Sequence, residues 1–347
     1  MGDVLEFSNT RINSSELNSG NYVSTENILQ NFQGIVKARS IPEDTNVMAF
    51  SCGNILLSNI RPYLKKVWKA TFNGGCSSDV FVLQANSNID ADYLHYVVAN
   101  DKFIGFVMNG AKGVKMPRGD KNQMKTYSLS LPSIKEQRKI SRFLSFLDER
   151  IAVQNRLIED LKKLRCAVSN KLFQSVKGVV IPLSGISNIV KGKQINGDFL
   201  AEVGEYYVMN GGTEPSGYYD NYNVEANTIS ISEGGNSCGY VQFNRMPFWS
   251  GGHCYTIQDI VSDVETLYLY HYLKSKEDSI MKLRIGTGLP NIQKKDLAEF
   301  KVIIPAIEQQ RTISNILSLL ERKTEIEGRM LIAMRTEKQY LLHQMFI

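Results

Sequence analysis

The sequence has no cysteine pattern that would indicate a disulfide framework or a structural metal site. Its five cysteines form no CxxC pair and their number is odd. Secreted domains that depend on disulfides usually carry an even, closely spaced set of cysteines. We therefore expect a protein of a reducing compartment, the cytoplasm.

Long apolar runs and a strong charge of one sign are missing as well. No window approaches the about 18 apolar residues that a membrane span needs. The first residues, MGDVLEFSNT, lack the basic stretch and apolar run of a signal peptide. A formal net charge of +5 over 347 residues favours an anionic partner only weakly. With 43% hydrophobic residues, the chain can fill more than one packed core.

Motifs of several enzyme classes do not occur. The [ND]PP[YFW] signature of adenine methyltransferases, the GxGxxG of dinucleotide-binding folds and the GxxxxGK[ST] of P-loop proteins are all absent. His253 and Cys254 are neighbours, and neighbours on a strand point to opposite faces, which disfavours a catalytic Cys–His pair. His95 and His271 have no further ligands beside them, so packing or capping is their expected role. We expect no catalytic residue and no metal site.

The sequence does contain an internal repeat. LPSIKEQRKISRFLSFLDER (131–150) returns as IPAIEQQRTISNILSLLERK (304–323), an offset of 173 residues. Weaker similarity continues upstream, pairing NILLS (54–58) with NTISIS (227–232) and SSDVFVL (77–83) with GGHCYTI (251–257). We interpret the chain as a tandem duplication. Its period of about 170 residues is too long for a solenoid, so it predicts two similar domains related by a pseudo-two-fold axis.

The front part of each copy has the texture of an α/β or α+β domain. Short runs such as NVMAF, NILLSNI, DVFVLQA, TISIS and CYTIQ are typical of strands. The segments 90–108 and 263–283 are each expected to form one helix.

The back part of each copy predicts a long helix with a heptad seam. Residues 134–173 contain neither Gly nor Pro, and Ser133 is the expected N-cap. The first seam consists of Ile140, Leu144, Leu147, Ile151, Ile158, Leu161, Val168 and Leu172, with Gln154 and Arg165 in its gaps. The second consists of Ile313, Leu317, Leu320, Leu331, Met334, Leu341 and Met345, interrupted by Thr324, Glu327 and Lys338. We expect an antiparallel coiled coil of two helices, each roughly 60 Å long.

Further apolar residues lie off the seam of the first helix. They are Phe143, Phe146, Leu157 and Leu164. A pair of helices cannot bury a face of that width by itself, so we interpret these four residues as a partner interface. Contact with the chain's own domains is the alternative.

These motifs together resemble the specificity subunits of type I restriction-modification systems. In that family a proline, followed shortly by Glu-Gln and an isoleucine, opens each long helix. The first copy has Pro132, Glu136, Gln137 and Ile140, and the second has Pro305, Gln310 and Ile313, with Gln309 replacing the glutamate. GNILLSNIRPYLKKVW with GGCSSDVFVL resembles one type of target-recognition domain, and YYVMNGGTEPSGYYDNYN with TISISEGG and FWSGGHCYTI resembles another.

The resemblance implies an α+β fold in which two α/β target-recognition domains, 1–130 and 176–303, are separated by two antiparallel coiled-coil helices, 131–175 and 304–347. Each domain would read one half of a bipartite site on double-stranded DNA. The helices would set the spacing and dock two methyltransferase subunits, which restriction subunits can join. This chain would be non-catalytic and carry no cofactor, because S-adenosylmethionine would bind to the methyltransferase.

Basic and glycine-rich loops supply the candidate DNA contacts. In the first domain, Arg61 suits a guanine edge and the basic residues around it suit phosphates; a solvated basic turn is the alternative. The first-domain candidates are Arg61, Tyr63, Lys65, Lys66, Lys112, Lys115, Arg118 and Lys121. In the second domain the candidates for base contacts are Asn210, Thr213, Tyr218, Ser232 and Asn236, while Gly211 and Gly212 would permit close approach of the backbone to DNA. Tight turns are an equal explanation of this glycine-rich loop. The candidates for phosphate contacts are Lys191, Lys193, Arg284, Lys294 and Lys295.

Two other functions compete with DNA recognition. A cytoplasmic coiled-coil adaptor with two protein-binding domains would share the architecture, but it has no need for loops that differ between the copies. A fused methylating or cleaving enzyme would require the motifs that are absent.

Overall fold

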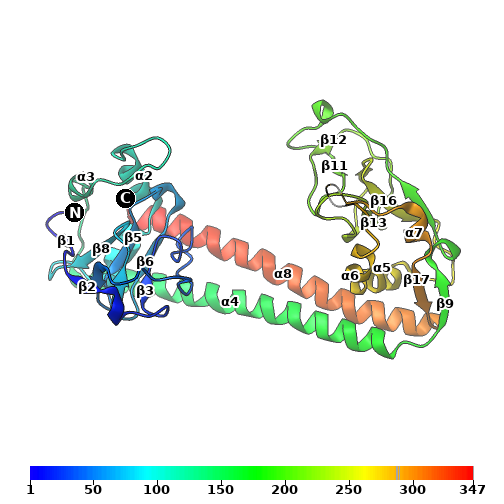
Figure 1. The fold of residues 1–347 in the computed structure, drawn as a ribbon, viewed down its shortest axis with the longest axis horizontal. Coiled ribbons are helices and arrows are strands. Elements are labelled where there is room, and N and C mark those ends of the chain that lie inside the picture. The colour runs from blue at the N-terminus through cyan, green and yellow to red at the C-terminus, as the bar shows by residue number, and fades with distance from the viewer. Residues whose placement is uncertain (287, 289, 347) are drawn as a thin grey trace. The chain divides into compact units, whose positions relative to one another are not determined.

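The computed structural model describes residues 1–286, 288 and 290–346. The chain forms two compact units. Unit 1 contains residues 1–155 together with the chain from 329 onward, and unit 2 contains residues 156–328. Each unit holds one α+β globule and part of each long helix (Figure 1).

Unit 1 contains two four-stranded sheets. The first has the antiparallel order β1 (Leu5–Phe7), β8 (Val80–Ala85), β5 (Ile55–Ser58), β6 (Val67–Lys69). The second has the order β2 (Arg11–Asn13), β4 (Asn46–Phe50), β7 (Gly74–Cys76), β3 (Tyr22–Val23). Every residue of β5 is buried, which places this strand in the core. Short 3-10 turns lie at Ser14–Glu16 and Pro62–Leu64.

Unit 2 repeats the first sheet strand for strand. Its order is β10 (Asn188–Lys191), β16 (Cys254–Gln258), β13 (Thr228–Ser232), β14 (Val241–Asn244), again antiparallel. A second sheet contains β12 (Tyr218–Tyr219), β11 (Tyr206–Met209) and β15 (Trp249–Ser250), and β9 (Val179–Pro182) pairs with β17 (Lys301–Ile304). Two 3-10 turns lie at Leu183–Gly185 and Gly197–Phe199. The internal duplication of the sequence is therefore a duplication of the fold.

The expectation of one helix at 90–108 and one at 263–283 is wrong. The chain forms α1 (Ala91–Val98) and α2 (Asp101–Asn109) in unit 1, and α5 (Thr266–Ser275) and α6 (Glu277–Met281) in unit 2. The side chain of Asn100 accepts a hydrogen bond from the Lys102 amide and so starts a second helix. At Lys276 the amide is shared between the carbonyls of Tyr272 and Leu273, which ends the helix in a tight turn. The short helices α3 (Lys121–Lys125) and α7 (Lys294–Ala298) follow.

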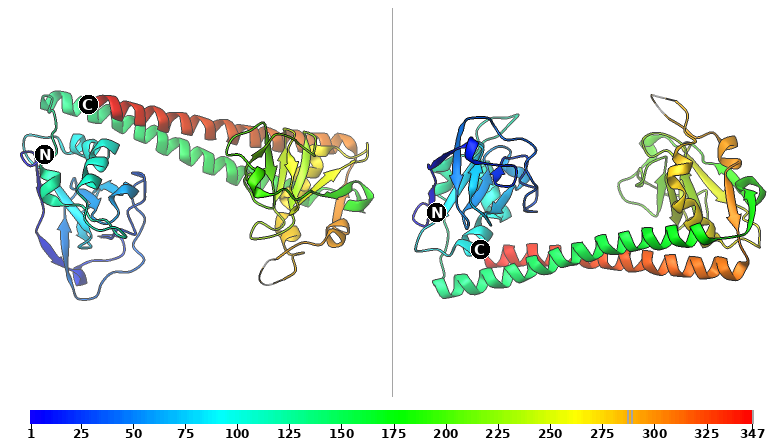
Figure 2. Two further views of the ribbon diagram at one scale, coloured as in Figure 1. Left: turned by 90° about the horizontal axis from the view of Figure 1, so that it is seen from above. Right: turned by 60° about the horizontal axis from the view of Figure 1, so that its bottom comes forward.

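Two long helices, α4 (Ile134–Ser175) and α8 (Ile307–Met345), run side by side in opposite directions (Figures 1 and 2). In unit 1, Asp148 pairs with Lys338 and Asn155 accepts from Arg335. In unit 2, Arg165 pairs with Glu321 at 2.9 Å. Residues further along α4 contact residues nearer the start of α8, as antiparallel helices do. All the expected seam residues are buried or half-buried. The antiparallel coiled coil is confirmed. Across the described residues, no helix combines the length and apolarity that a membrane crossing requires.

The glutamine of the repeated motif joins each long helix to its globule. In unit 1, Gln137 accepts from the Asp90 amide (2.8 Å) at the start of α1 and donates to the Pro132 carbonyl (3.0 Å). Gln310 makes the same two bonds in unit 2, with Glu265 (2.9 Å) and Pro305 (2.9 Å). Both side chains are almost fully buried. The N-cap expected at Ser133 is confirmed by its bond from the Glu136 amide (3.3 Å).

The two matched histidines are packed inside their units. His271 is 6% exposed and its Nε2 lies 2.9 Å from Ser318 Oγ. Burial, with a contribution from nearby positive charges, lowers the pKa of both His95 and His271 to about 4. Both rings are therefore neutral at pH 7.

We expect the free energy of unfolding to fall as the pH drops from about 6.5 to about 4. In this pH range the unfolded histidines bind protons and the folded ones stay neutral. The contribution of the two histidines to the free energy of unfolding is therefore complete above about pH 6.5 and is lost on acidification. His271 contributes up to about 3 kcal/mol of the loss. Urea unfolding at several pH values tests this. His271→Gln should flatten the profile, and an unchanged slope would contradict the assignment.

Candidate nucleic-acid interface

The candidate surface of unit 1 consists of two loops that backbone hydrogen bonds hold together. One follows β5, at residues 59–66, and the other joins α2 to α3, at residues 110–120. The Arg61 amide donates to the Pro117 carbonyl (2.8 Å), and the Gly119 amide donates to the Asn59 carbonyl (3.0 Å). Lys112 and Arg118 exchange backbone bonds within the second loop. The structure thus brings together two basic segments that are about 50 residues apart in sequence.

Arg61 is an exposed cation of this surface. Its backbone is left-handed, with φ 51° and ψ 58°, an uncommon conformation for arginine. The following Pro62 begins a 3-10 turn and is buried, so the loop is fixed while the Arg61 side chain is exposed. Within the described part of the chain, its guanidinium has no hydrogen bond or ion pair. Tyr63 beside it is 48% exposed.

The other predicted cations of unit 1 differ in how far they are already engaged. Lys65 pairs with Asp101 (2.7 Å), Lys112 with Asp120 (2.7 Å), and Arg118 with Asp79 (3.1 Å). The Lys66 ammonium donates to the Thr25 carbonyl, and burial lowers its pKa. Lys121 lies over the rings of Phe7 and Phe81. Lys115 is exposed, and the described residues offer it no partner.

Unit 2 builds the same surface from the loop after β13 and the loop between α6 and α7. The Gly235 amide donates to the Pro290 carbonyl (3.0 Å), as Arg61 does to Pro117, and the Ile292 amide donates to the Glu233 carbonyl (2.9 Å). Ile285 and Asn291 form the backbone pair that Lys112 and Arg118 form in unit 1. The backbone is repeated, but the side chains displayed on it differ.

Four predicted residues of unit 2 join at this surface. Ser232 Oγ donates to the Gly211 carbonyl (2.7 Å), Asn210 Oδ1 accepts from the His253 amide (3.1 Å), and Lys191 pairs with Glu233 (2.6 Å). Gly211 has φ 84°, which favours glycine. Tyr218 lies in β12, where it pairs with Tyr207 of β11. The remaining predicted residues are half-buried or exposed: Lys193, Gly212, Thr213, Asn236, Arg284, Lys294 and Lys295.

Sequence reasoning missed Glu233 and His253 as members of this surface. His253 is 64% exposed on its side chain, whereas Cys254 is buried and burial raises its pKa to about 11. A signal was present, because aligning GGHCYTI with SSDVFVL places His253 opposite Asp79, which pairs with the basic loop of unit 1.

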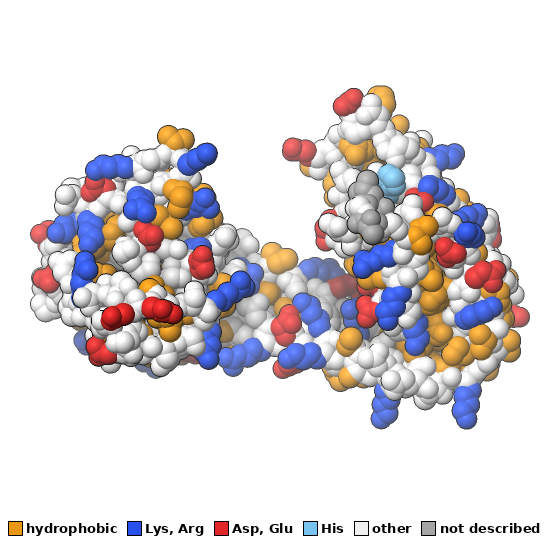
Figure 3. Space-filling model, in the orientation of Figure 1, with side chains coloured by type: hydrophobic (Ala, Val, Ile, Leu, Met, Phe, Trp, Pro, Cys, Tyr) orange, Lys and Arg blue, Asp and Glu red, His pale blue; other side chains and the backbone are white. Residues whose placement is uncertain are grey.

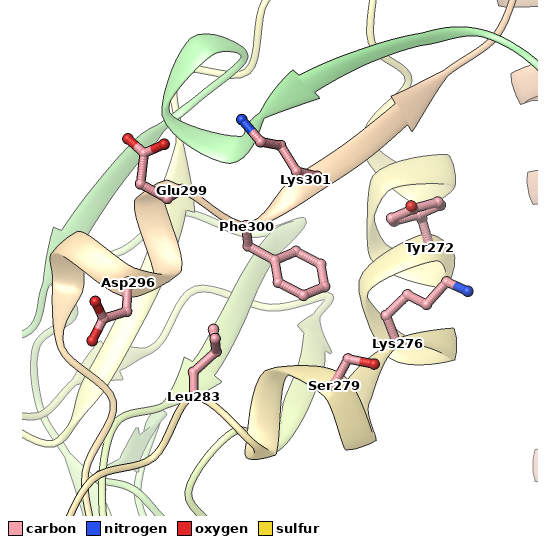
Figure 4. Close-up of a pocket in the computed structure, with 8 residues that line it drawn as sticks. All are labelled: Tyr272, Lys276, Ser279, Leu283, Asp296, Glu299, Phe300 and Lys301. Carbon is pink, nitrogen blue, oxygen red and sulfur yellow. The ribbon is translucent and has the colours of Figure 1, made fainter.

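A pocket of about 670 Å³ in unit 2 lies among α5, α6, α7 and β17 (Figure 4). The pocket is lined by two lysines, Lys276 and Lys301, and two acids, Asp296 and Glu299, around the Phe300 ring, so its charges are balanced. Among the described residues, no three His, Cys, Asp or Glu side chains are placed to hold a metal ion. On the face shown in Figure 3, basic and acidic side chains alternate over both units.

The family model described as the type I restriction modification DNA specificity domain matches residues 1–163 and 176–333. The chain belongs to this specificity-domain family. The two matched segments correspond to the two copies of the sequence repeat.

Individual relatives of the specificity-domain family agree with this assignment. A Mycoplasma pneumoniae protein provisionally named a type I specificity subunit is 31% identical over 166 residues, 47% of this chain and 44% of that protein. The MjaVIII specificity subunit of Methanocaldococcus jannaschii is 23% identical over 304 residues, 72% of this chain and 68% of that protein. The Mycoplasma alignment thus spans slightly less than half of that relative's length.

The fold is also that of a solved specificity subunit. The crystal structure of the type I restriction-modification S subunit from M. genitalium matches 100% of this chain and 94% of its own, with a TM-score of 0.71 and 22% identity. A second solved structure is described as the structural basis underlying complex assembly and conformational transition of the type I restriction-modification system. It matches 99% of this chain and 95% of its own, with a TM-score of 0.61 and 18% identity.

Proposed function

We propose that this chain is the DNA-specificity subunit of a type I restriction-modification system, with each unit reading one half of a bipartite site on double-stranded DNA. The observation that carries the proposal is the repeated pair of loops with different side chains. Arg61 corresponds to Gly235, and Arg118 to Asn291. A reader of two unrelated half-sites needs one scaffold with two chemistries. A symmetric protein-binding adaptor does not.

Exposed apolar residues on the long helices favour the proposal that two methyltransferase subunits dock there. On α4, Phe143, Phe146, Val153 and Leu157 form an exposed apolar stripe beside the seam. At the same offset of 173 residues, α8 exposes a second stripe consisting of Ile316, Leu319, Ile326 and Met330. Each residue of the two stripes is between 38% and 67% exposed. Two equivalent apolar stripes fit two copies of one partner. Leu164, which is also exposed, extends the first stripe. In this proposal, restriction subunits can join the complex of the chain with its methyltransferase subunits.

The chain is proposed to be non-catalytic and cytoplasmic, with S-adenosylmethionine bound by its methyltransferase partner. We expect no methyl transfer when the purified chain is incubated with DNA and S-adenosylmethionine alone. The reason is the absence of an adenine methyltransferase signature. Transfer of labelled methyl groups by a preparation free of the partner would refute this part of the proposal.

Arg61→Ala should relax base preference in one half-site only, by roughly 1–3 kcal/mol at the affected position. The guanidinium is exposed and pairs with no described residue, which suits bidentate contact with a guanine edge. The matched control is Lys115→Ala, which should weaken binding to all sequences alike and lower the salt dependence by about one ion. Competition binding with single-base variants of the site measures both. Retention of every base preference by Arg61→Ala would exclude direct readout by this residue.

A further inference from the structure

Glu233 is a nearly buried acid beneath the candidate surface of unit 2. Its side chain is 9% exposed. Oε1 lies 2.6 Å from the Lys191 ammonium and accepts from the Tyr255 hydroxyl at 3.1 Å. Oε2 is buried and makes no hydrogen bond within the described residues. His253 Nδ1 lies 3.7 Å from Oε2. Oε1 is therefore hydrogen-bonded, whereas Oε2 faces the His253 imidazole at a distance slightly too long for a hydrogen bond.

The two groups that Glu233 faces are both accessible. The side chain of Lys191 is 52% exposed and that of His253 is 64% exposed. The backbone of His253 is fixed on both sides, because its amide donates to Asn210 Oδ1 (3.1 Å) and its carbonyl accepts from the Glu233 amide (2.9 Å). A small movement of the ring would bring Nδ1–H into hydrogen-bond range of Oε2. In the tautomer that carries its proton on Nδ1, the Nε2 atom on the far side of the ring is an acceptor.

Unit 1 has a related arrangement at the same place. Asn59 corresponds to Glu233, since its amide donates to the Asp79 carbonyl (2.8 Å) and its own carbonyl accepts from Gly119 (3.0 Å). Asn59 Oδ1 is also buried without a hydrogen bond among the described residues. The acid of unit 1 is Asp79, paired with Arg118 at 3.1 Å. Both units thus set a carboxylate against a nitrogen donor beneath the loops, but they take the two groups from different positions.

We propose that Glu233 is a positioning residue for half-site recognition, which holds the His253 ring with Nδ1–H toward its carboxylate and Nε2 toward a base edge. Lys191, held by the same carboxylate, contacts the adjacent phosphate. An acceptor nitrogen at Nε2 recognises an exocyclic amino group, which only adenine and cytosine present in the major groove. A buried acid near a polyanion is unfavourable unless it organises such donors. This inference rests on the proposed function, in that unit 2 must read DNA.

The test is selection of duplexes from a random-sequence pool by the chain assembled with its methyltransferase partner. Three variants are compared with the wild type: Glu233→Gln, His253→Ala and the double variant. Both single variants should lose, by about tenfold or more, the preference for adenine or cytosine at one position of one half-site. The double variant should lose no more than either single variant, because Glu233 acts through His253. Glu225→Gln, which removes an exposed charge from the same unit, should change no preference.

The other half-site is the internal control for folding and must remain unchanged. A loss that is equal in both half-sites, losses that multiply in the double variant, or full retention of preference by His253→Ala would each overturn the inference. His253→Ala decides the matter even if Glu233→Gln fails to fold, because its side chain is largely exposed. If the wild type selects no sequence at all, the proposed function itself fails, and this outcome is distinct from the others.

Discussion

Replacing Phe146 and Leu319 together by aspartate is expected to abolish methylation by the assembled complex. The two residues occupy equivalent places on α4 and α8 and are 49% and 67% exposed. The folded chain should tolerate the change, because neither side chain belongs to the seam. A carboxylate buried without a partner in an apolar interface costs several kcal/mol, enough to prevent docking at micromolar concentrations. Methyl transfer and the mass of the assembled complex measure the effect.

The single variants give this prediction its sharpest form. Phe146→Asp or Leu319→Asp alone should leave one stripe intact and yield a complex with a single methyltransferase subunit. Arg156→Asp with Arg329→Asp is the matched control, because both are exposed, lie at the same offset and lie outside the stripes. A double variant that still assembles two partners, or a control pair that abolishes assembly, would show that the stripes are not the docking surface.

Lengthening both long helices should widen the gap between the two halves of the recognised sequence. We consider four residues inserted after Asn155 in α4 and four after Gly328 in α8, where the chain passes from one unit to the other. The insertion adds about 6 Å of helix, and four residues turn a helix about 400°, so each half returns close to its original face. A coiled coil absorbs such a stutter by local unwinding.

B-DNA rises about 3.4 Å per base pair, so the gap should grow by one or two base pairs. The half-site bases should remain unchanged, since the inserted residues are distant in sequence from the loops of both units. Modified adenines are mapped on a plasmid library methylated by the variant together with its partner. An unchanged gap would mean that the helices do not set the spacing, and altered half-site bases would mean that the reading loops depend on them.

The long helices were predictable because a heptad seam is a periodic signal carried by many residues. The strands NVMAF and CYTIQ were predictable for a similar reason, as short apolar runs between turns. The break in each shorter helix was not, because one residue decides it. Asn100 has a side chain that caps a new helix, and such a local choice overrides apolar periodicity without changing it. Lys276 shows no such sequence signal at all.

The candidate site was predictable only in part. The basic segments around Arg61 and Lys115 were visible as charges in glycine- and proline-containing loops. Their pairing was not, because backbone hydrogen bonds between distant segments leave no pattern in the residue types. A search for positive charge also overlooks a buried acid, which is why Glu233 escaped notice. The same search predicted that Lys66 contacts a phosphate. In the structure the Lys66 ammonium donates a hydrogen bond to the Thr25 carbonyl.

If the proposed function is right, the two units read the two halves of one DNA site. The most direct measurement is the sequence that the chain, assembled with its methyltransferase partner, selects from random duplexes, compared with the sequence selected after the loop 59–66 is replaced by glycine and serine. We expect two blocks of specified bases separated by a gap of fixed length, and loss of only one block in the loop variant. A single continuous block, or loss of both blocks together, would contradict it.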